Sequence, residues 1–167
     1  SQQIVFTLGG DPEDGYSGLD LAFRNAPFRD GAAINYILAT DEDRDVLEDY
    51  ATFERMFGEI NQQNAMLNAI VSASFAGDAG NNALGIDSEG NSYHADGQGG
   101  FIKSPGGRVS SSAVSVRADY IDLAMASGGA AWNLNQLRSG GTSVQSFTEA
   151  FIDIKVEEIL EQLALNL

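Results

Sequence analysis

The segment 34–45 (Ile-Asn-Tyr-Ile-Leu-Ala-Thr-Asp-Glu-Asp-Arg-Asp) constrains the fold of this chain more than any other. Its first half is a short apolar run, which is typical of a strand buried on both faces of a sheet. Four carboxylates follow within the five residues 41–45, directly at the carboxyl end of that strand. Open α/β sheets place their ligand sites at this end. The segment therefore predicts an α/β sheet with an acidic binding edge.

Carboxylates this close repel one another unless a cation or a basic partner neutralises them. One interpretation is a site for a hard divalent ion, and the other is a solvated, acidic start of a helix. The spacing Asp41-x-Asp43-x-Asp45 matches alternate ligands of a calcium loop. Val46, however, stands where the sharp turn needs glycine, and Thr52 stands where a bidentate glutamate is needed. A stand-alone calcium loop of the EF-hand type is not expected.

Length and charge narrow the class of protein. The chain has 167 residues, so we expect one domain over residues 1–167. Its 24 acidic and 9 basic residues give a formal net charge of −15. Such a surface repels phosphate backbones and anionic membranes, which argues against nucleic acid as a partner. It suits secreted proteins, salty media or cation binding.

The chain contains no cysteine, which excludes a disulfide framework, a thiolate zinc site and a cysteine nucleophile. No segment approaches the roughly 18 consecutive apolar residues of a membrane span. The first residues lack the charged-then-apolar layout of a signal peptide. A start at Ser1 without methionine fits a processed product or an excised piece.

Apolar periodicity and helix-breaking residues predict the remaining elements. Helices are expected at 16–26, after the N-cap Thr52, at 116–127 and from Thr142 onward, and strands at 34–39, 67–75 and 130–134, with a hairpin joining 83–86 to 92–95. The apolar stripe of the last helix is expected to contain Val144, Phe147, Phe151, Ile154, Ile159, Leu160 and Leu163. Residues 3–8 are apolar but too few to assign. Helices alternating with buried strands indicate a three-layer α/β/α, Rossmann-like fold with a mostly parallel sheet and an added edge hairpin.

Polar residues outside the acidic segment have more ordinary explanations. His94 is the only histidine, and without a serine or cysteine partner it is typical of a surface or edge residue. Asp87, Glu89 and Asn91 can clasp a cation across the hairpin, although a polar turn accounts for them more simply. Trp132, in a short strand, is expected in the core.

Four motifs together resemble the later part of bacterial von Willebrand factor type A (VWA) domains. They are residues 37–45 (Ile-Leu-Ala-Thr-Asp-Glu-Asp-Arg-Asp), 13–16 (Glu-Asp-Gly-Tyr), 129–134 (Gly-Ala-Ala-Trp-Asn-Leu) and 151–156 (Phe-Ile-Asp-Ile-Lys-Val). The motifs cover most of the chain, and the strand that ends in Thr-Asp is the most specific. The resemblance implies a single VWA-like domain of the three-layer α/β/α type.

The resemblance also implies a metal site. In the family, an acidic residue at this strand end, matched here by Asp41, helps to hold a divalent ion at the metal-ion-dependent adhesion site. The loop before the first helix supplies a second ligand, usually a threonine hydroxyl. Here that loop offers Glu13, Asp14 and Ser17 but no threonine. The candidate ligands of Mg²⁺ or Ca²⁺ are therefore Asp41 with Asp14, Glu13 or Ser17, and Asp43 beside them.

The family's first strand ends in Asp-x-Ser-x-Ser, a motif that this sequence lacks. The resemblance then implies that the chain begins after the early strands and lacks the central strand of the sheet. The neighbouring strand would expose unpaired N–H and C=O groups, so something must fill the gap. We expect the N-terminal part of a longer chain, a strand from another copy, or residues 3–8 folding back.

Three functions from different classes fit these features. The first is an extracellular or cell-surface module for adhesion or protein binding, whose ligand reaches an acidic metal site near Asp41. The second is a structural subunit that self-assembles into a filament or surface layer, as the missing strands and the Gly- and Ser-rich composition suggest. An acid-base hydrolase with two carboxylates comes last, because nothing pairs them with a substrate groove, and an enzyme is not expected.

Overall fold

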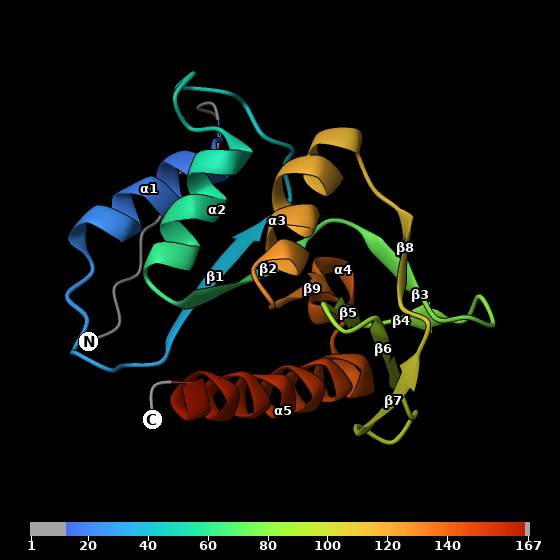
Figure 1. Ribbon diagram of the computed structural model, residues 1–167. Helices are drawn as coiled ribbons and strands as arrows, with labels where there is room; N and C mark the ends of the chain where they lie inside the picture. Colours follow the sequence, from blue (N-terminus) through green and yellow to red (C-terminus); the bar gives the residue numbers. More distant parts are fainter. Residues whose placement is uncertain (1–12, 166–167) are drawn as a thin grey trace.

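A computed structural model describes residues 13–165, which form a mixed α/β fold with two sheets (Figure 1). The main sheet has the strand order β1-β2-β9-β5-β6-β7. Its strands are β1 (Ile34–Thr40), β2 (Ala65–Val71), β9 (Ala130–Asn133), β5 (Gly85–Asp87), β6 (Asn91–Ala95) and β7 (Phe101–Pro105). The smaller sheet, in the order β4-β3-β8, contains β4 (Asn82–Ala83), β3 (Ser74–Ala76) and β8 (Arg108–Ser111). The α/β class predicted from the sequence is confirmed.

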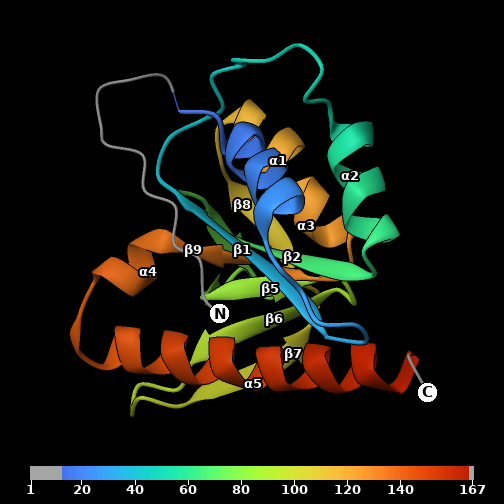
Figure 2. The same ribbon diagram turned by 90° about the vertical axis from the view of Figure 1, so that its left-hand side faces the viewer.

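The helices lie on both faces of the main sheet. They are α1 (Gly15–Asn25), α2 (Phe53–Gln62), the π-helical η1 (Val116–Ile121), α3 (Asp122–Ala126), α4 (Leu134–Arg138) and α5 (Gly141–Leu165). Helices α1, α2 and α3 cover one face, and α5 runs along the other (Figure 2). The predicted helices before Pro27, after Thr52 and at 116–127 are all present, the last beginning as a π-helix.

The sheet is mixed, whereas a mostly parallel sheet was expected. Strands β1, β2 and β9 are parallel, and the junctions β9–β5, β5–β6 and β6–β7 are antiparallel. The predicted hairpin exists as β5 and β6, but it extends the sheet from β9 rather than decorating an edge. Gly85 permits this pairing, because a Cβ there would lie 2.5 Å from the Trp132 ring. A glycine thus lets the hairpin backbone dock against the buried indole.

Within residues 13–165, β1 is the end strand of the main sheet. Its side chains are only partly buried, so the expectation that it is buried on both faces is wrong. Ile37, at its centre, is 53% exposed. Strand β2 is the strand buried on both faces, with all seven residues buried. The predicted strand at 67–75 is also broken: a turn in which the Ala73 N–H donates to Val71 O, at 2.9 Å, separates β2 from β3.

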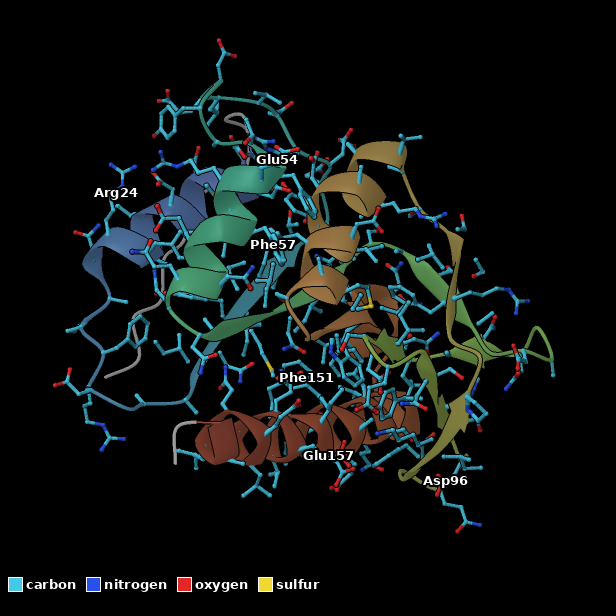
Figure 3. The ribbon with its side chains drawn as sticks, in the orientation of Figure 1. Arg24, Glu54, Phe57, Asp96, Phe151 and Glu157 are labelled. Atoms are coloured by element: carbon cyan, nitrogen blue, oxygen red, sulfur yellow. The ribbon has the colours of Figure 1, made fainter. Side chains whose placement is uncertain are left out.

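Helix α5 packs on the sheet through its first half, as predicted. Phe147 and Ile154 are buried, and the Phe147 and Phe151 rings meet Trp132 edge-on at 5.6 and 5.4 Å. Figure 3 shows Phe151 directed from α5 toward the sheet. The only tryptophan is therefore in the core, as expected.

The second half of α5 differs from the predicted stripe. Ile159, Leu160 and Leu163 are exposed, while Glu158 and Gln162 face the sheet. Helical spacing explains this, because positions four and eight residues after Ile154 share its face. The buried Glu158 carboxylate accepts hydrogen bonds from Asn68 Nδ2 at 3.1 and 3.0 Å and pairs with Lys155.

Candidate functional site at the carboxyl end of the parallel strands

The structure brings the start of α1 to the carboxyl end of β1. The Asp45 N–H donates to Glu13 O at 2.8 Å, and the Glu13 N–H donates to the Asp45 carboxylate at 3.1 Å. The Thr40 hydroxyl is 3.4 Å from the Glu13 carboxylate. The two acidic segments singled out in the sequence are therefore neighbours in space.

Asp14 is the buried centre of this region. One carboxylate oxygen accepts from the Tyr16 N–H at 3.0 Å and from Arg44 Nε at 2.8 Å. The other accepts from Ser17 Oγ and from the Leu47 N–H, both at 3.1 Å. Asp14 is thus the N-cap of α1 and also holds the loop that follows β1. Both of its oxygens are already occupied by donors from the protein itself.

Arg44 supplies the positive charge that the buried carboxylate requires. Its guanidinium carbon lies 4.0 Å from the centroid of the Tyr16 ring, and Nη2 donates to Ala51 O at 2.6 Å. Nη1 is 3.8 Å from the Asp119 carboxylate. The acidic loop therefore contains its own cation, which folds inward while the acidic side chains around it point to solvent.

Burial and the charge of Arg44 shift the pKa values of the two nearby carboxylates, Asp14 and Asp119, in opposite directions. Burial alone would raise the pKa of Asp14, but hydrogen bonds from Arg44 and Leu47 and the Arg44 charge together hold it below its usual range. Burial raises the pKa of Asp119, and the more distant Arg44 offsets this only in part. Asp14 and Arg44 are therefore the true ion pair of the cluster.

Two tyrosines connect α1 to η1 beneath this pair. Tyr120 OH accepts from the Gly15 N–H at 3.1 Å, and Tyr16 OH donates to Asp119 O at 2.7 Å. Burial raises the pKa of Tyr120 to about 12, so its hydroxyl stays protonated. A Cβ at position 15 would lie 2.8 Å from the Tyr120 ring, which explains the glycine of the Glu-Asp-Gly-Tyr motif.

Asp41 lies apart from Asp14, at the surface. Its carboxylate accepts from Arg138 Nη2 of α4 at 2.9 Å, and the two side chains are 48% and 55% exposed. The hydrogen bond from Arg138 holds the pKa of Asp41 below its usual range. Asp43 accepts instead from Ser115 Oγ at 3.2 Å.

The five predicted metal ligands are thus divided among separate partners. Asp14 and Ser17 bind each other, while Glu13, Asp41 and Asp43 each contact a different segment. Within residues 13–165, no group of three or more histidine, cysteine, aspartate or glutamate side chains is placed to hold a metal ion. In this arrangement Asp14 and Arg44 form a buried, neutralised pair, the brace. The exposed carboxylates of the loop after β1 form an acidic rim, which consists of Glu42, Asp43, Asp45, Glu48 and Asp49.

Sequence reasoning missed Arg44, Arg138 and the adjacent residues Asp119 and Tyr120. One signal was present: Arg44 is the only basic residue between Arg29 and Arg55, and it lies inside the carboxylate run. A lone arginine among acids is a natural partner for a buried carboxylate. No comparable local signal marked the other three.

His94 is buried in β6, which lies between β5 and β7 in the main sheet, so the prediction of a surface or edge residue is wrong. Its Nδ1 lies 2.8 Å from Asn82 O and its Nε2 lies 2.9 Å from Ser92 Oγ. Ser92 is fully buried, and its hydroxyl also donates to Ser104 O at 3.1 Å. The pair therefore joins β6 to β4 and β7.

The hairpin residues form a polar turn. One Asp87 oxygen accepts from the Glu89 N–H at 3.0 Å and from the Asn91 N–H at 2.8 Å. The other accepts from Asn91 Nδ2 and from the buried Tyr93 hydroxyl, both at 2.8 Å. These bonds satisfy the carboxylate, as the turn interpretation predicts.

Comparison with protein-family models, with curated proteins and with solved structures finds no match for this chain. Among the helices of residues 13–165, none is long and apolar enough to cross a lipid bilayer. Arguments about function therefore depend on the geometry of the molecule.

Proposed function

We propose that this chain is a VWA-like module for protein binding or adhesion, acting outside the cell or at its surface. The recognition surface is the acidic rim above the carboxyl end of β1. One observation carries the proposal: the rim residues Glu42, Asp43, Asp45, Glu48 and Asp49 are all exposed, and within the described part of the chain none of them forms a salt bridge. Such a concentration of unneutralised carboxylates attracts basic groups or cations.

The local architecture supports the same proposal. A strand, an acidic loop and a helix follow one another from β1 to α2, and β2 and β9 lie parallel to β1. This arrangement is compatible with the resemblance to the VWA family. The rim also lies where α/β sheets bind ligands. The partner proposed is a protein surface that presents basic side chains.

A divalent ion is proposed as a bridge between the rim and its partner. The described residues do not form a ready metal site, so Mg²⁺ or Ca²⁺ would have to draw exposed carboxylates together. Asp41 and Asp43 are the side chains that the proposal assigns to the ion, because hard cations prefer oxygen ligands. Asp14 and Ser17 are already bound to protein donors.

Calorimetric titration with MgCl₂ and CaCl₂ tests the cation part of the proposal. Asp41→Asn and Asp43→Asn should reduce the heat of binding, whereas Asp153→Asn, an equal loss of charge on α5, should not. A short polylysine peptide tests the protein-binding part with the rim variants Asp43→Asn and Glu48→Gln and the control Asp153→Asn, and its affinity should fall as salt screens the rim. Equal binding by the wild type and all variants would remove the rim as a recognition surface.

Self-assembly is the second candidate function, and the exposed side of α5 favours it. Ile152, Val156, Ile159 and Leu163 are exposed and repeat at helical spacing of four, three and four residues. Exposed apolar stripes of this kind mark contacts between proteins. Light scattering over a range of concentrations tests it: Val156→Lys should reduce association of the chain with itself, and Glu161→Lys, at an exposed position of α5 outside this stripe, should not.

A further inference from the structure

The loop between β1 and α2 buries its arginine and exposes its large apolar side chains. Arg44 is buried, and so is Ala51 at the other end of the loop. Between them, Val46, Leu47 and Tyr50 are 61%, 52% and 45% exposed. Single exposed apolar residues are common on protein surfaces and need no explanation. These three lie within five consecutive residues, and a cluster of exposed apolar side chains marks a site of interaction.

Hydrogen bonds hold this part of the loop in place. The Leu47 N–H donates to the Asp14 carboxylate at 3.1 Å, and the Thr52 N–H donates to Tyr50 O at 3.0 Å. The Tyr50 hydroxyl lies 3.3 Å from the Asp20 carboxylate of α1. Figure 1 shows the loop at one end of the molecule, beyond α1 and α2. A partner therefore meets apolar side chains on a backbone that is already ordered, which lowers the entropic cost of binding.

The acidic rim restricts which partner can cover these side chains. Asp45, Glu48 and Asp49 stand beside them in the same loop, and none of the three forms a salt bridge within residues 13–165. A purely apolar surface would take these carboxylates out of water without pairing them, which is unfavourable for a charged group. An anionic membrane would repel them. A suitable partner must therefore carry lysine or arginine around its own apolar side chains.

We propose that the loop 45–50 binds a basic amphipathic segment of another protein. Apolar side chains of that segment contact Val46, Leu47 and Tyr50, and its lysines or arginines pair with the rim. This inference rests on the proposed function and adds to it the class of partner. Apolar anchors in a polar surround carry most of the binding energy in many interfaces, whereas complementary charges mainly raise the rate and specificity of association.

Two synthetic peptides of equal length, with equal numbers of lysines, test this inference in the full chain. One has leucines between its lysines and the other has serines, and calorimetry measures the affinity of each. Leu47→Ser and Val46→Ser should each lower the affinity of the leucine peptide about fivefold and leave that of the serine peptide unchanged. Both substitutions keep the backbone N–H groups of the loop. Ile102→Ser, which removes an exposed apolar side chain from β7 at the other end of the main sheet, is the control and should change neither affinity.

The outcomes separate this inference from the proposed function. The leucine peptide should bind about tenfold more tightly than the serine peptide and should retain binding at high salt, because salt screens charges and not apolar contacts. Equal affinities, or no effect of either loop variant, would overturn the inference and leave the rim as a surface that recognises charge alone. Binding of neither peptide would overturn the proposed protein binding as well. Binding to phosphatidylcholine vesicles that Leu47→Ser abolishes would assign the loop to a membrane and would also overturn the inference.

Discussion

Two aspartate–arginine pairs lie near the carboxyl end of the parallel strands. Their nitrogen–oxygen distances are almost the same, but their surroundings differ. Asp14 and Arg44 are 2.8 Å apart, and their side chains are 0% and 6% exposed. Asp41 and Arg138 are 2.9 Å apart, and their side chains are about half exposed. Separation alone therefore does not distinguish a pair that holds the fold together from a pair that a ligand can reach.

The difference lies in what else each pair contacts. The Asp14–Arg44 pair joins the start of α1 to the loop at Leu47 and to Ala51, one residue before the N-cap of α2. Water cannot replace these bonds without opening the cluster. The Asp41–Arg138 pair joins only two exposed side chains, so water or another charge can replace either partner.

Replacement of Arg44 should have the largest effect. Arg44→Met leaves the Asp14 carboxylate buried without its counter-charge, and we expect a loss of about 3–5 kcal/mol in the free energy of unfolding. Urea denaturation measures this loss. Arg138→Met is the matched control and should cost less than about 1 kcal/mol. Similar losses for both variants would show that burial does not separate the two pairs.

The acid dependence of stability should show the next largest effect. The pKa of Asp14 is lower in the folded chain than its ordinary value of 3.8, so the folded state binds fewer protons near that pH. Its contribution to stability is complete above pH ~4 and is lost as the pH falls through the folded pKa. Asp119, whose pKa is raised, acts in the opposite sense and offsets part of this loss.

The variant Asp14→Asn tests whether Asp14 causes this acid dependence of stability. In this variant the stability measured by urea denaturation should fall less steeply between pH 5 and pH 3 than in the wild type. Asp41→Asn is the control: the pKa of Asp41 is also lowered, but its exposed pair is screened by solvent and should change the slope less. A wild-type slope in Asp14→Asn would assign the acid dependence to other groups.

Features set by neighbouring residues were predictable from the sequence. Helix α1 ends just before Pro27, as expected, and the Thr52 side chain caps α2 by accepting from the Arg55 N–H at 3.3 Å. The strand from Ile34 and its acidic end were also predicted. In each case the signal lies within a few residues of the feature that it determines.

Features that depend on distant partners were not predictable. Strand β5 inserts between β9 and β6 because Gly85 fits under Trp132, a residue far along the chain. Arg44 faces Asp14 across 30 positions of sequence, so periodicity did not indicate that the acidic loop would fold its own cation inward. The metal-site hypothesis considered the carboxylates together, whereas the chain distributes them among separate donors.

The smallest expected effect concerns the coupling within the exposed pair. A double-mutant cycle with Asp41→Asn and Arg138→Met should give a coupling energy of about 0.2–1 kcal/mol, because two solvated side chains gain little from their attraction. Salt at 1 M shortens the screening length to about 3 Å, so the coupling should nearly vanish there. The same cycle for Asp14 and Arg44 should give a larger value that salt changes little, because ions do not reach the buried pair. Equal salt sensitivity of the two couplings would mean that the cluster around Asp14 opens to solvent, and the distinction between the brace and the rim would no longer hold.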